Sequence, residues 1–172
     1  MFVNVMGWSM FRKSFLRLLL TLFCIIPVGA VAGESATISG AWLANGYQQI
    51  FVSAPIKLYQ FDLSGHVSMT QGIAGELDFW SQCVGIGTSP EDIEARCLWQ
   101  DLDGGSIILQ LRGQSLQEGV EVAGNIVGGA GKYAGITGTV AFTWSALSFG
   151  REEGRTVLTG HTTNLGGEYT IP

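Results

Sequence analysis

Apolar and polar residues alternate along most of this chain beyond residue 35, and no run has the 3.6-residue apolar period of an amphipathic helix. A period of two is typical of β-strands with one face in a core and the other in water. We therefore predict strands almost throughout. Three runs carry the pattern well, with apolar positions at Ala95, Cys97 and Trp99, at Ile107, Leu109 and Leu111, and at Val140, Phe142 and Trp144.

Turn-forming residues divide this pattern into about eight or nine short strands. Pro55 lies inside the long apolar run 48–63, where its missing N–H splits the run or places it on a sheet edge. Short strands at regular spacing are typical of a sandwich or barrel, and an exported sheet avoids open edges most completely by closing. We predict an all-β fold, a single antiparallel β-barrel of about eight strands. Turn signals lie at Asn45-Gly46, Ser64-Gly65, residues 72–75, residues 101–105 and residues 164–167.

The N-terminal residues 1–32 have the composition of an export signal, so we assign the barrel domain to residues 33–172. An apolar run of 11 residues at positions 18–28 follows a basic stretch and precedes small residues suited to signal peptidase. The run is shorter than the roughly 20 residues that span a bilayer as a helix. This favours a cleaved signal over the alternative, a retained anchor, and predicts a periplasmic or secreted protein without a stable membrane span. The basic residues are Arg12, Lys13 and Arg17.

Cleavage of the signal would make the domain strongly acidic. It would remove three of the nine Lys and Arg residues and none of the 14 Asp and Glu residues, leaving six against 14 and a net charge of −8. Such a domain has no basic footprint for phosphate groups. We therefore expect neither nucleic acid nor an anionic lipid surface as a partner.

Cys83 and Cys97 are the two cysteines that remain after signal cleavage. An even pair in an exported domain predicts a disulfide, and antiparallel pairing of residues 77–86 with residues 93–100 would bring the two together. Redox chemistry is the alternative, but the Cys-x-x-Cys spacing is absent.

The glycine cluster at residues 128–138 is the first candidate for chemistry, with five glycines in 11 residues. Glycine-rich loops can bind phosphates, but Gly131-Lys132 is followed by Tyr133 where a P-loop has Ser or Thr, and no helical pattern follows. Glycine also permits positive φ and close backbone approach. We therefore predict a structural turn motif formed by Gly128, Gly129, Gly131, Gly135 and Gly138.

This cluster resembles the Gly-Gly-Thr-Gly-Lys/Arg-Tyr/Phe-Ala-Gly-x-x-Gly signature of the allene oxide cyclase-like and dirigent-like β-barrels. The turn at residues 101–105, Asp-Leu-Asp-Gly-Gly, is similar to the Asp-x-Asp-Gly-Asp turn of bacterial exported relatives. Ala130 and Gly105 depart from the two patterns. The resemblance covers residues 97–144 and implies an eight-stranded antiparallel barrel with a central cavity, often in dimers or trimers. It does not transfer an activity, because the signature is structural.

Metal binding has little support in the sequence. Asp101 and Asp103 could suggest calcium, but residues 105 and 112 are not the ligands that an EF-hand loop requires. His66 and His161 are the two histidines, too few for a three-histidine zinc site. We therefore predict no metal and no cofactor.

Catalytic groups are equally hard to assign. A carboxylate inside an apolar barrel could act as an acid or base, with Glu76, Glu94 and Glu121 as candidates, yet alternation favours solvent for Glu94 and Glu121. No Gly-x-Ser-x-Gly nucleophile elbow occurs. We assign no catalytic residue. The aromatic residues that could line a pocket or fill the core are Trp42, Tyr59, Trp80, Trp99, Phe142 and Trp144.

Three functions remain open from the sequence. The favoured one is an exported barrel that binds a small hydrophobic or amphipathic molecule in its lumen. A cyclase-like or isomerase-like enzyme for a hydrophobic substrate is the second. The third is a structural or interaction module of the cell envelope, which could include a homo-oligomer.

Overall fold

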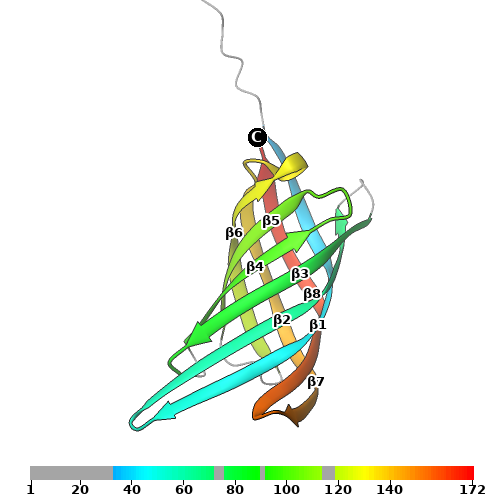
Figure 1. Ribbon diagram of the computed structural model, residues 1–172. Coiled ribbons are helices and arrows are strands. Elements are labelled where there is room, and N and C mark those ends of the chain that lie inside the picture. Colours follow the sequence, from blue (N-terminus) through cyan, green and yellow to red (C-terminus); the bar gives the residue numbers. More distant parts are fainter. Residues whose placement is uncertain (1–32, 72–75, 90–91, 114–118) are drawn as a thin grey trace, which may run out of the picture. The chain divides into compact units, whose positions relative to one another are not determined.

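The chain forms a closed antiparallel barrel of eight strands in which each strand pairs with its neighbours in sequence and β1 pairs with β8 (Figure 1). This computed structural model describes residues 33–71, 76–89, 92–113 and 119–172. The predicted fold class is confirmed. The strands are β1 (Glu34–Ser53), β2 (Ile56–Gln71), β3 (Glu76–Gly87), β4 (Ile93–Gln100), β5 (Ser106–Gly113), β6 (Val120–Ala130), β7 (Thr137–Glu152) and β8 (Arg155–Ile171), with a 3₁₀ turn η1 (Gly131–Tyr133).

Alternation along the strands fills the barrel with apolar side chains. Every second residue of β4 is buried, beginning at Ile93, and the same alternation runs through β3. Because paired residues share a face, the buried positions of neighbouring strands meet in one continuous core. The largest fully buried side chains are Trp99, Trp144, Phe79 and Leu109.

Two predicted turns are wrong, because the chain passes through them as strand. β1 continues through Gly46, and β2 continues through Gly65. A Cβ atom at Gly46 would collide with the carbonyl oxygen of Asp62, and one at Gly65 would collide with that of Leu43. These glycines therefore allow close strand approach inside a long hairpin rather than reversal of the chain. The reversal occurs instead at Ala54 and Pro55, where the apolar run splits.

The predicted turn at residues 164–167 is also wrong, since β8 continues to Ile171. The register of β8 shifts against both β1 and β7 near Asn164, which marks a β-bulge. The Asn164 side chain replaces the missing ladder bonds. Its Oδ1 accepts hydrogen bonds from the Thr143 backbone N–H at 2.9 Å and the Thr162 hydroxyl at 2.7 Å, and its Nδ2 donates to Thr143 Oγ1 at 3.0 Å.

The two ends of the barrel differ in construction (Figure 1). The upper end carries η1 and the β4–β5 turn. At the lower end the β1–β2 and β7–β8 hairpins extend beyond the shorter strands, because β6 pairs with β7 only as far as Trp144. The predicted signal at residues 1–32 and the predicted turn at residues 72–75 lie outside the described residues.

Candidate functional site

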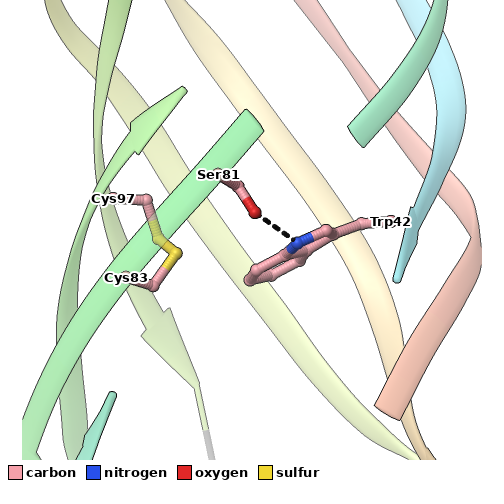
Figure 2. The surroundings of a disulfide bond; sticks show 4 residues. All are labelled: Trp42, Ser81, Cys83 and Cys97. Carbon is pink, nitrogen blue, oxygen red and sulfur yellow. Dashed lines mark hydrogen bonds between the residues drawn. A yellow bond between two sulfur atoms is a disulfide. The ribbon is translucent and has the colours of Figure 1, made fainter. Parts of the chain in front are cut away.

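A disulfide joins β3 to β4 inside the barrel, as predicted for Cys83 and Cys97 (Figure 2). The two residues lie directly opposite each other in the antiparallel register, with Cα atoms 4.1 Å apart, and both are buried. Their position on the inward face follows from the alternation of both strands. The bond is consistent with an oxidising compartment.

Beside the disulfide, Trp42 reaches across the lumen from β1 to β3 (Figure 2). Its indole Nε1 donates a 2.8 Å hydrogen bond to the hydroxyl of Ser81, and both side chains are buried. Trp42 also packs against Phe142 and Trp144, with ring centroids 5.5 and 5.3 Å away. The sequence analysis missed Ser81, although its parity with Cys83 on β3 indicates an inward position.

Large aromatic residues are buried in the lumen, and small hollows lie between the described side chains. One, of about 20 Å³, lies near the upper end beside Trp99 and Tyr133. Another, of about 40 Å³, lies nearer the lower end. A water molecule requires roughly 10–15 Å³, so the lower hollow has room for about three or four water-sized groups. Its lining residues are Trp42, Phe61, Leu63, Cys83, Ile93, Ala95, Cys97, Leu111, Gly113, Val122, Phe142 and Trp144.

A broad groove of about 860 Å³ lies next to the lower hollow, along β4 to β8. The groove and the hollow share the lining residues Ile93, Gly113, Val122 and Phe142. Small outward-facing residues on neighbouring strands form its floor, because the register aligns Ala123, Ala141 and Gly166. An apolar recess and an open polar groove therefore adjoin at this end.

The described groove lining is predominantly acidic. Asp92, Glu94 and Glu121 contribute carboxylates, and Arg112 contributes the guanidinium. Arg112 Nη2 lies 2.7 Å from Glu94 Oε1, and both side chains are largely exposed. This ion pair leaves Asp92 and Glu121 without a cationic partner among the described lining residues, which favours a neutral or cationic group there. The sequence analysis had considered Glu94 and Glu121 but missed Arg112 and Asn164, whose place here depends on strand register.

At the upper end, the structure brings the β4–β5 turn and the glycine cluster together. The Asp101 carboxylate organises the turn, since its Oδ1 accepts hydrogen bonds from the backbone N–H groups of Asp103 at 3.0 Å and Gly105 at 2.8 Å. Lys132 of η1 places Nζ 2.7 Å from Asp101 Oδ2 and 3.2 Å from Asp103 Oδ2. The aspartates thus pair with a lysine of this chain.

Tyr133 closes the lumen beneath this ion pair. Its ring is buried and lies 5.6 Å from that of Phe79. Burial and, to a lesser degree, the neighbouring Asp101 carboxylate raise the pKa of Tyr133 to about 12. Burial alone would raise the pKa of Asp101, but Lys132, Tyr133 and the Gly105 backbone N–H together hold it below its ordinary value of 3.8.

The glycines of the cluster meet different requirements. Gly131 and Gly135 have φ angles of 65° and 80°, a region that L side chains rarely adopt. A Cβ at Gly129 would lie 2.7 Å from the Ile136 side chain, and one at Gly138 would lie 2.8 Å from the Tyr169 Cα. Gly128 has nothing within 4 Å of its Cβ position. Four of the five positions therefore have a local reason for glycine.

The remaining candidates lie apart on the exterior. His66 and His161 both lie opposite Leu43, on the strands either side of β1, so roughly two strand spacings, about 10 Å, separate them. Glu76 is exposed at the start of β3. Across the described ranges, no three His, Cys, Asp or Glu residues are grouped closely enough to hold a metal ion.

Within the part of the chain that the structure describes, no helix is long and apolar enough to cross a membrane. No family model, curated protein or solved structure matches the chain.

Proposed function

We propose that this protein is an exported, periplasmic or secreted, barrel that binds a small amphipathic molecule at its lower mouth. The observation that carries the proposal is that two unlike hollows share the lining residues Ile93, Gly113, Val122 and Phe142. An apolar end would enter the 40 Å³ recess, and the polar end would lie in the 860 Å³ groove.

The size and charge of these hollows define the ligand class. The recess admits a slim group, such as the end of an alkyl chain, rather than a whole ring system. The carboxylates of Asp92 and Glu121, which have no cationic partner among the described lining residues, would repel a fatty acid headgroup and attract an ammonium or hydroxyl group. The ligand class is therefore a neutral or cationic amphiphile.

The proposal favours binding over catalysis because the buried hydroxyl groups of Ser81 and Thr162 are engaged in the barrel wall. Among the described residues, Ser81 accepts the Trp42 indole hydrogen bond, and Thr162 is held by Asn164. A relationship to the allene oxide cyclase-like and dirigent-like barrels remains part of the proposal. The eight-stranded closed barrel and the contact between residues 101–105 and 128–138 support it.

The first test is native mass spectrometry of protein purified from its own envelope. The second is titration with alkyl-trimethylammonium, alkyl alcohol and fatty acid series, with binding measured by tryptophan fluorescence. We expect saturable binding of the first two series and weak or no binding of fatty acids. Ala95→Val fills the recess without changing the groove and should weaken binding for every chain length. Glu121→Gln should weaken the cationic series alone.

Two results would contradict this function. One is binding that is unchanged in Ala95→Val, since the apolar end would then lie elsewhere. The other is protein that is recovered empty and takes up no member of the three series. Val127→Thr, on the exposed outer face of β6, serves as the matched control and should leave all affinities unchanged.

A further inference from the structure

The β1–β2 hairpin ends in an apolar tip that the barrel does not cover. Residues 50–56, Ile-Phe-Val-Ser-Ala-Pro-Ile, contain no charge, and all seven are exposed. Figure 1 shows this hairpin extending past the lower end of the barrel. The exposed fractions of its large apolar residues are 48% for Ile50, 44% for Phe51, 67% for Val52 and 65% for Ile56.

Amphipathic and basic side chains lie beside this tip and directly behind it. Tyr59 lies opposite Ile50 in the register, and Lys57 lies opposite Val52. On the adjoining strands, the Arg155 guanidinium lies 4.1 Å from the ring centroid of Tyr47, whose hydroxyl donates a 3.2 Å hydrogen bond to Glu152. Tyrosine and basic residues of this kind are favoured where hydrocarbon meets lipid headgroups.

The second hairpin at the same end has a different tip. Arg151, Glu152, Glu153 and Arg155 lie in or next to its turn, whereas Lys57 is the one charged residue at the corresponding positions of the β1–β2 hairpin. Charged residues are costly in hydrocarbon, and this tip would remain at headgroup level. The contrast favours insertion of the β1–β2 tip over insertion of the β7–β8 tip.

We propose that the β1–β2 tip, residues 50–56, inserts into the outer layer of a lipid bilayer and anchors the barrel there reversibly. The arrangement along the hairpin fits a membrane interface: the apolar tip comes first, with Lys57 and Tyr59 beside it, and the Tyr47–Arg155 pair lies behind it. The attraction is apolar, because a chain with 14 acidic and nine basic residues gains nothing from an anionic surface. The partner is therefore a zwitterionic bilayer, and the docking stands independently of the ligand proposed for the lower mouth.

A label at the tip gives the direct test. The exported protein, with the N-terminus that it carries after purification, receives an environment-sensitive fluorophore at Ser53→Cys and is mixed with phosphatidylcholine vesicles. Any unpaired Cys24 is first replaced by Ser. We expect a blue shift and quenching by lipids that carry a spin label on the acyl chain. The same label at Leu102→Cys, in the turn at the upper end, should show neither.

Charge substitutions in the tip give a second test of the proposal. Val52→Asp and Ile56→Asp should each lower vesicle partitioning by roughly tenfold or more, since each places a carboxylate where an apolar group would be buried. Leu102→Asp, whose side chain is 99% exposed, is the matched control and should change partitioning little. Adding phosphatidylserine should weaken binding, and raising salt should leave binding to phosphatidylcholine nearly unchanged.

Three outcomes would overturn the proposal: a tip label that is insensitive to vesicles, equal loss of binding in Leu102→Asp, or a concentration-dependent blue shift without lipid. The last would identify a second copy of the chain as the partner. Near-ultraviolet circular dichroism of the buried tryptophans establishes that each variant is folded, so a loss of binding refers to the tip.

Discussion

Breaking the Cys83–Cys97 bond should lower the free energy of unfolding by about 3 kcal/mol. The residues are separated by 14 positions and close a loop of about 15 residues, for which chain entropy in the unfolded state gives that figure. For a domain of roughly 140 residues, with an unfolding entropy of about 2.1 cal/mol/K per residue, this corresponds to a Tm decrease of about 10 °C.

Chemical reduction measures the contribution of the cross-link to stability better than mutation does, because both sulfur atoms stay in the lumen. The buried bond is reduced in guanidinium, the protein is refolded with reductant present, and its Tm is compared with that of oxidised protein refolded in the same way. The Cys83→Ala, Cys97→Ala pair should lose more, since it also enlarges the 40 Å³ hollow that both residues line. An unchanged Tm on reduction would refute the loop-entropy estimate, and two freely reactive thiols in the purified protein would refute the bond itself.

Ser81→Ala should lower the free energy of unfolding in guanidinium by about 1–3 kcal/mol, because it leaves the buried Trp42 Nε1 without its partner. In a Trp42→Phe background the same substitution should lower it by less. The lowered pKa of Asp101 implies stability that is complete above pH 3.8 and is lost as pH falls through the folded-state value, so Asp101→Asn should flatten the acid side of the stability profile. Burial raises the pKa of Tyr133 to about 12, so its contribution is complete below pH 10 and is lost as pH rises toward 12, and Tyr133→Phe should remove that alkaline transition. Gly131→Ala should lower the free energy of unfolding by about 1–2 kcal/mol, because the φ of 65° at this position is strained for an L residue. An unchanged Tm in thermal unfolding would contradict this strain.

Local alternation made the strands around the disulfide predictable. β4 occupies residues 93–100 as expected, and Cys97 shares the buried face with Trp99. The lengths of β1, β2 and β8 were not predictable, because glycine permits both a turn and a close strand contact and the sequence does not distinguish them. Gly46 and Gly65 belong to the second kind, which only the neighbouring strand reveals.

The candidate site was less predictable than the strands because it depends on the pairing register of several successive strands. Glu94 was a visible candidate, but its partner Arg112 follows from the β4–β5 pairing. The groove floor requires correct registers for β6, β7 and β8 as well, and one residue of error would invert each face. The outward-facing residues that these registers align along the groove are, in strand order, Glu94, Arg112, Ala123, Ala141 and Gly166.

Changes at the upper end of the barrel should affect stability, and changes at the lower end should affect binding. At the upper end, the side chain of Asp101 is only 6% exposed and is paired with Lys132, and Tyr133 fills the space below, so changes there should act on unfolding. At the lower end, Glu121 and Val52 are exposed, and changing them should leave unfolding nearly unaltered. Lys132→Ala should therefore lower the Tm while leaving amphiphile and vesicle affinities of the folded protein intact. Val52→Asp should have the opposite effect, with an unchanged Tm and weaker vesicle binding. If both variants moved both measurements, the barrel would couple its two ends, and the assignment of binding to the lower end alone would fail.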